Sequence, residues 1–225
     1  MRTKISSHNW EHQIKFNDGS TTLLVIEDSD AFRKYITELK SQIEGIEGDF
    51  AFSNEKDSLS FKDRFAIISN PLQVDFTDKR IQTKITSLMK NHMSNETHYE
   101  AMTTVLSQLE SFAQDLEMDF PFEVEHSEPD IQALVKMFGF SLKLDYQNEI
   151  DKLSEYTNVL HDVCGIDHFV FVSMFNYFNE RTIQAFIREC NANKHNLLFI
   201  ERYDQTIENA SQKILIDHDL CEIFE

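Results

Sequence analysis

The sequence predicts an α/β fold into which a helical lobe is inserted, and three features of the 225-residue chain support this prediction. First, residues 21–26, 169–173 and 197–200 are apolar runs without alternation, which is typical of strands covered on both faces of a parallel sheet. Second, a helical periodicity follows the first run and separates the other two. Third, the stretch between these two regions, residues 78–158, is mostly helical. We therefore predict an α/β head domain at residues 1–77 plus 159–225 and an α-helical leg lobe at residues 78–158.

The N-terminal part begins with a strand, a turn and a helix. The run TTLLVI at residues 21–26 is apolar and β-branched, and Asp28 or Ser29 is a suitable N-cap for the helix that follows. Apolar side chains then recur at helical spacing up to Ile43, and Gly45 is a plausible end. Three short strands are expected next, at residues 49–53, 58–61 and 65–69.

The middle of the chain changes to a helical period. We expect helices from residue 77, from residues 94–96, at 128–138 and at 148–164, the last two ending at Gly139 and Gly165. Alternation of apolar and polar residues predicts two short strands between them, at residues 120–125 and 140–144.

The C-terminal part returns to strands. A helix at residues 180–190, capped by Asn179, joins the apolar runs FVFVS and LLFI, and a connection of this length suits a parallel pair. Further strands are expected at residues 213–216 and 220–224. Neither end of the chain alone has enough strands to cover itself, so we expect both ends to share one sheet.

Composition limits the class of protein. The 21 basic and 39 acidic residues give a net charge of −18, which argues against a protein that coats nucleic acid with its whole surface. The longest apolar runs fall far short of the roughly 18 residues that a membrane helix needs, so we expect no membrane partner. The three cysteines, Cys164, Cys190 and Cys221, are widely spaced and odd in number, which favours a reducing cytoplasm.

The first strand–turn–helix is where a nucleotide-binding α/β protein places its phosphate loop. Such a loop needs glycines for close backbone approach and a lysine for charge, and the turn here reads Glu27-Asp28-Ser29-Asp30. Three carboxylates would repel phosphate. The pattern therefore argues against binding of ATP or a dinucleotide at this turn.

An acidic stretch lies in the middle of the chain. Residues 115–130 contain seven Asp and Glu and no Lys or Arg. On the strand expected at 120–125, Glu123 and Glu125 would point to the same face, and Glu128 follows at the turn. Oxygen-rich clusters suit a hard cation such as Ca²⁺, and a solvated acidic edge is the alternative.

A basic stretch precedes it. Residues 79–95 contain Lys79, Arg80, Lys84 and Lys90 and no acid, which reverses the overall charge locally. Arg80 and Lys84 lie near one helical face, as in a helix that contacts phosphates. A helix that docks on the chain's own acids would look the same. No aromatic residue interleaves with the lysines, so any DNA contact is expected to be to the backbone and independent of sequence.

Several strings, taken in order, resemble a known family. LLVIEDSDAF is similar to the opening strand and helix of the ring-forming DNA-end-binding proteins of type II-A CRISPR adaptation, in their short form. VKMFGFSLK resembles the leg lobe of that family. FVFVSMFNYFNERTIQAFIREC with LLFIERYD resembles its second βαβ unit, and ILIDHDLCEIF its closing strands. The resemblance covers nearly the whole chain.

The resemblance implies a fold and a function. The head would resemble a P-loop NTPase or RecA-like sheet without a working phosphate loop, and the leg would be a helical insertion in it. A homotetramer would form a ring with a basic hole that threads linear double-stranded DNA from its ends, without sequence preference and without cutting. Calcium ions would hold the ring in its binding shape. The implied partners are the CRISPR adaptation nuclease pair and the type II effector nuclease, in spacer acquisition and antiviral defence.

The resemblance also implies site residues. The acidic calcium-binding string of the family falls on FEVEHSEPD, which gives Glu123, Glu125, Glu128 and Asp130 as metal ligands. Local charge gives Lys79, Arg80, Lys84 and Lys90 as the DNA-binding residues. No catalytic residue is expected.

Two alternatives remain open. A metal-dependent nuclease or phosphotransferase could use the same acidic cluster, since Mg²⁺ held by two acids can drive phosphoryl transfer. A protein-interaction module without any nucleic-acid role would fit the net charge alone.

Overall fold

The computed structural model describes residues 2–224 and divides them into two compact units. Unit 1 comprises residues up to Asp75 together with those from Leu144 onward, and unit 2 comprises Phe76–Lys143. The sequence analysis assigned residues as far as 158 to the helical lobe. In the structure, helix α5 (Glu149–Cys164) groups with unit 1, where Ser154 donates a hydrogen bond to Glu189 of helix α6 (Glu180–Ala192) at 3.0 Å.

Unit 1 is built on a mostly parallel six-stranded sheet in the order β5-β6-β7-β3-β8-β9. Strands β5, β6, β7, β3 and β8 are parallel, and β9 pairs with β8 in the antiparallel direction. The two ends of the chain therefore share one sheet, as predicted. The bounds are β3 (Thr21–Ile26), β5 (Phe65–Ile68), β6 (His168–Val172), β7 (Asn196–Glu201), β8 (Gln212–Ile216) and β9 (Glu222–Phe224).

A second, antiparallel sheet of three strands also belongs to unit 1. Its order is β2-β1-β4, with β1 (Thr3–Ser7), β2 (Ile14–Phe16) and β4 (Phe50–Ser53). The sequence analysis predicted β4 but not β1 or β2. The strand predicted at residues 58–61 was wrong, because only Ser58 forms a bridge there, to Ser53.

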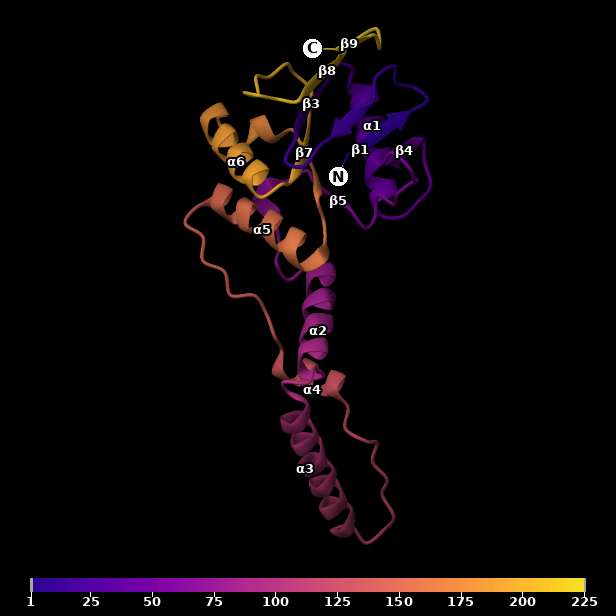
Figure 1. The fold of residues 1–225 in the computed structure, drawn as a ribbon, viewed down its shortest axis with the longest axis vertical. Helices are drawn as coiled ribbons and strands as arrows, with labels where there is room; N and C mark the ends of the chain where they lie inside the picture. The colour runs from indigo at the N-terminus through magenta and orange to yellow at the C-terminus, as the bar shows by residue number, and fades with distance from the viewer. Residues whose placement is uncertain (1, 225) are drawn as a thin grey trace. The chain divides into compact units, whose positions relative to one another are not determined.

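The helices of unit 1 cover the large sheet on both faces, as Figure 1 shows. Helix α1 (Ser29–Ile43) and the three-stranded sheet cover one face, where their apolar side chains form a core with Leu24, Val170 and Leu198. Helices α5 and α6 lie on the other face, and Phe171 and Phe186 meet there edge to face. Short 3₁₀ helices occur at Pro71–Gln73 and Met174–Asn176. The continuous burial of β3, β6 and β7 follows from this two-sided cover.

Unit 2 contains three helices: α2 (Lys79–Met93), α3 (Tyr99–Met118) and α4 (Ile131–Phe138). Helices α2 and α4 contact each other, and Leu134 and Val135 of α4 are buried. Gly139 ends α4 with a positive φ of 60°, as its sequence position predicted. The strands predicted at residues 120–125 and 140–144 were wrong, because both segments lack strand structure. Alternation yields a strand only where a neighbouring strand supplies hydrogen bonds.

Across residues 2–224, no helix combines the length and the apolar character needed to cross a membrane.

Candidate functional site

The turn between β3 and α1 is closed by its own carboxylate. Asp28 caps helix α1, and its Oδ1 accepts hydrogen bonds from the backbone N–H groups of Asp30 at 3.1 Å and Ala31 at 2.8 Å. These amides belong to the helix N-terminus, where a phosphate would otherwise bind. The side chain therefore occupies two of the donors that a phosphate loop offers to its ligand. Of the two caps that the sequence analysis offered, Asp28 and Ser29, the structure selects Asp28.

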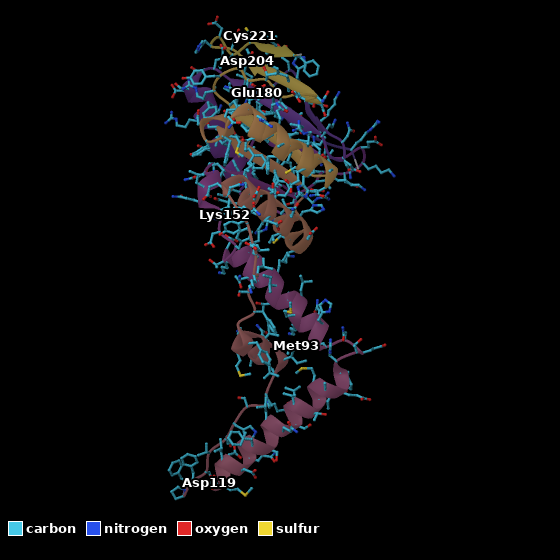
Figure 2. All side chains as sticks on the ribbon, turned by 90° about the vertical axis from the view of Figure 1, so that its left-hand side faces the viewer. Met93, Asp119, Lys152, Glu180, Asp204 and Cys221 are labelled. Atoms are coloured by element: carbon cyan, nitrogen blue, oxygen red, sulfur yellow. The ribbon has the colours of Figure 1, made fainter. Side chains whose placement is uncertain are left out.

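The acidic segment, residues 119–130, has an irregular backbone. It begins at Asp119, where α3 ends, as the label in Figure 2 marks. Glu123, Glu125 and Glu128 are exposed, and Asp130 caps α4 by accepting a hydrogen bond from the N–H of Ala133 at 2.8 Å. Because the segment is no strand, strand alternation does not bring Glu123 and Glu125 to one face.

These acidic residues do not come together within one chain. Considering residues 2–224, no three His, Cys, Asp or Glu side chains are grouped so as to hold a metal ion. The role of the four acidic residues as metal ligands therefore stays a prediction. Their carboxylate oxygens are the type of donor that Ca²⁺ prefers.

A histidine that the sequence analysis did not single out fastens this segment to α3. His126 forms hydrogen bonds through Nδ1 to Glu117 at 2.7 Å and through Nε2 to Glu110 at 3.0 Å. The bond to Glu117, followed by the bond to Glu110, raises the pKa of His126 above its ordinary value. Glu110 and Glu117 are two helical turns apart, so one face of α3 presents both. The spacing of the two glutamates could be predicted from the sequence, but the contact of His126 with them could not, because the segment after α3 has no regular structure.

The predicted DNA-binding residues lie on α2. Lys79, Lys84 and Lys90 are exposed and Arg80 is half-buried, while Asp78 caps the helix through the N–H of Arg80 at 2.7 Å. The helical period places Arg80 and Lys84 one turn apart, and Lys79 and Lys90 three turns apart on another side. Neither pair is shown to contact a ligand, so their role stays a prediction.

A polar network in unit 1 was also missed. Arg64 donates two hydrogen bonds to Asp167, which accepts a third from Nδ1 of His168 at 2.6 Å. Nε2 of His168 is then an acceptor for the hydroxyl of Thr3 at 2.8 Å. Burial alone would raise the pKa of Asp167, but the bonds from His168 and Arg64 outweigh burial and hold it below its usual range.

Hydrogen bonds join the hydroxyl of Thr3, the imidazole of His168 and the carboxylate of Asp167 in a row, but the imidazole is buried away from solvent. His168 is 1% exposed and lies against the rings of Phe16, Phe52 and Phe65. Burial lowers the pKa of His168, so the ring is neutral at pH 7. The arrangement fixes β1 against the beginning of strand β6 in the large sheet.

Helix α3 differs from the other helices because none of its residues is buried. Its apolar side chains are nevertheless large: Phe112 is 61% exposed and Met118 is 77% exposed. Other exposed apolar residues of unit 2 include Val105, Leu109, Leu116, Phe120, Phe122, Val124, Met137, Phe138 and Phe140. So many exposed large apolar side chains on one unit favour an interaction site there.

Comparison with known proteins identifies the class. Residues 42–220 match a family model described as a CRISPR-associated protein. The chain belongs to that family, Cas_Csn2. Membership implies a role in CRISPR adaptation together with other proteins of that process, and the family is generally regarded as non-catalytic.

Two further comparisons add little. The search of curated proteins found no match. Among solved structures, the chain is similar to a bacterial Atm1-family ABC exporter with ATP bound, with 14% identity and a TM-score of 0.45. The match covers 96% of this chain and 38% of the exporter chain, and a likeness at this level carries no argument about function.

Proposed function

We propose that this protein is a non-enzymatic clamp on the ends of linear double-stranded DNA. Four copies form a ring that encloses the duplex without sequence preference, in the cytoplasm, during acquisition of new CRISPR spacers. The adaptation nuclease pair and the type II effector nuclease are its proposed partners. The head would be a P-loop NTPase or RecA-like sheet without a working phosphate loop.

The exposed apolar surface of unit 2 is the observation that carries this proposal. A 20-residue helix without a single buried residue is not stable through its own packing. Burial of an apolar face against another copy supplies about 25 cal/mol for each Å² removed from water. Phe112, Leu116 and Leu109 are therefore proposed to lie in a contact between copies.

Calcium is proposed to support the ring through Glu123, Glu125, Glu128 and Asp130. The carboxylates fit a hard cation in kind, and Asp130 uses only its Oδ1 for the helix cap. Because a single chain does not gather three ligands, a second copy would have to complete the set. A bound cation would also cancel negative charge in a chain that carries −18.

The first experiment measures mass and DNA binding together. Light scattering in calcium should give four subunits and a smaller species after chelation. Gel shift should show binding to linear duplex and none to covalently closed circles of the same sequence. Single subunits at high protein concentration with abundant calcium, or equal binding to closed circles, would overturn the clamp. Release of nucleotides in Mg²⁺ or Mn²⁺ would instead support the nuclease alternative.

The second experiment tests helix α2. Lys84→Gln combined with Lys90→Gln removes two proposed phosphate contacts. Each such contact contributes about 0.9 to the slope of log affinity against log salt concentration, so the slope should fall by about 1.8 for every copy whose helix α2 contacts the duplex. Lys34→Gln combined with Lys40→Gln, exposed on α1, is the matched control and should leave the slope unchanged. An unchanged slope in the α2 variant would remove α2 from the interface.

A further inference from the structure

A basic pocket that the function above does not use lies at the end of the three-stranded sheet where β1 begins and β2 and β4 end. It is a cavity of about 520 Å³ in unit 1, and its lining includes Arg2, Lys4 and Lys15, with one carboxylate, Glu55. The amide side chains of Asn17 and Asn54 line it as well. In a chain with a net charge of −18, three cations around one cavity form a local reversal of sign.

The two lysines are direct cross-strand neighbours. Lys4 of β1 is paired with Lys15 of β2 in the antiparallel register, so both side chains stand on the same face. Like charges in this position repel and destabilise the pair. Across the described residues neither lysine takes part in an ion pair. No ion pair within the described part of the chain offsets the repulsion directly, and a bound anion would relieve it.

The floor of the pocket is held in place by the network described above. Thr3 lines the pocket, and its hydroxyl donates a hydrogen bond to Nε2 of His168. The other ring nitrogen of His168, Nδ1, donates to Asp167. Arg64 anchors Asp167 through two hydrogen bonds. Because β1 is fixed from below, the backbone that carries Lys4 is preorganised for a ligand.

Charge identifies the class of ligand. Three cations and one carboxylate leave an excess of about two positive charges, and a phosphate monoester carries about −1.5 to −2 at pH 7. A phosphodiester carries a single charge and would leave the excess unmatched. Arginine and amide groups supply donors for the additional oxygen of a monoester.

We propose that the basic pocket binds a phosphate monoester, and that on a DNA ligand this monoester is the 5′-terminal phosphate of a duplex end. The inference rests on the proposed function, because it adds recognition of the terminal phosphate to the threading by which a duplex end enters the ring. A free nucleotide or inorganic phosphate shares this chemistry, and the experiment separates these sources.

The binding experiment compares two duplexes that differ only in carrying a 5′-phosphate or a 5′-hydroxyl. Wild type should bind the phosphorylated duplex about tenfold more tightly, the value of one hydrogen bond to a charged group. The variant Lys4→Gln with Lys15→Gln should lose this preference, and the Lys34→Gln, Lys40→Gln control should keep it. Equal affinity of wild type for both duplexes, or a variant that weakens both equally, would overturn the monoester site.

A stability measurement keeps the inference testable apart from DNA binding. Inorganic phosphate or AMP, at ionic strength matched with sodium chloride, should raise the melting temperature of wild type. Lys15→Glu relieves the repulsion, so this variant should melt higher without ligand and no longer respond to phosphate. An equal response in both proteins would overturn the pocket. If wild type binds no duplex but still responds to phosphate through Lys15, the clamp fails while the monoester site is supported.

Discussion

Unit 1 buries most of its large apolar side chains, whereas unit 2 leaves many of its own exposed. In unit 1 the strands β3, β6 and β7 are buried along their whole length, and helices cover the large sheet on both faces. In unit 2 the longest helix, α3, has no buried residue although it carries several large apolar side chains. Unit 1 can therefore be stable through its own core, whereas the apolar surface of unit 2 needs a partner to cover it.

The largest expected effect lies in the core of unit 1. Phe171 is fully buried and packs against Phe186 and Phe199. Phe171→Ala should lower the free energy of unfolding by about 3–5 kcal/mol, because it removes apolar contacts and leaves a cavity. Chemical denaturation measures this loss. Phe171→Leu, which keeps more of the volume, should cost less, and a loss below about 1 kcal/mol in the alanine variant would contradict the comparison.

A smaller effect on stability is expected from Glu201, a buried carboxyl group in unit 1. Glu201 at the end of β7 is 3% exposed, and burial raises its pKa to about 7. Its Oε1 accepts a long hydrogen bond from the N–H of Phe175, at 3.4 Å, and hydrogen bonds from the backbone of Phe175 and Met174 offset only part of the effect of burial. The folded state therefore binds a proton that the unfolded state has released between about pH 4.5 and 7, so the contribution of Glu201 to stability should fall as pH rises through this window and then level off.

Glu201→Gln should remove this dependence on pH. At pH 8 the variant should be about 2 kcal/mol more stable than wild type, since one pKa unit corresponds to about 1.4 kcal/mol and part of the shift is screened. Unfolding midpoints measured from pH 5 to pH 8 test the prediction. The lowered pKa of His168 makes stability rise with pH in both proteins and cancels in the comparison, so the same slope in wild type and variant would refute the prediction.

The smallest effect on stability is expected in unit 2. Phe112 on α3 is 61% exposed, so Phe112→Glu should change the stability of a dissociated chain by less than about 0.5 kcal/mol. Its effect on assembly should be large, because a charge would enter the proposed contact between copies. Light scattering measures the mass. Ser111→Glu introduces the same charge one position away and should leave assembly intact, and equal behaviour of both variants would remove Phe112 from the contact.

The sequence predicted elements best where apolar residues are continuous. Runs such as TTLLVI and FVFVS can be stable only inside a two-sided sheet, and helices with clear caps, such as α5 between Asn148 and Gly165, are recognisable from local chemistry. Strand β1 (TKISS) gives no such pattern, since its identity depends on pairing with β2 and β4. The alternating segment at residues 120–125 has the pattern of a strand but no strand beside it.

The contacts of site residues were predictable only where the partners are close together in the sequence. The Asp28 cap lies within one turn of chain and could be expected. The network of Thr3, Arg64, Asp167 and His168 joins residues separated by 103 and 165 positions, and no local pattern indicates such contacts. The acidic residues Glu123, Glu125 and Glu128 were chosen by composition and resemblance, and their role as calcium ligands still awaits measurement.

The carboxylate of Asp28 has a consequence for energetics. At this helix terminus the amides of Asp30 and Ala31 are already bonded to the Asp28 side chain, so they are not spare donors with which to sense the gain or loss of a terminal phosphate. The geometry of this turn therefore gives no support to a coupling of nucleotide hydrolysis to movement. Under the function proposed above, travel of the ring along a duplex would be thermal diffusion, with no fuel to give it a direction.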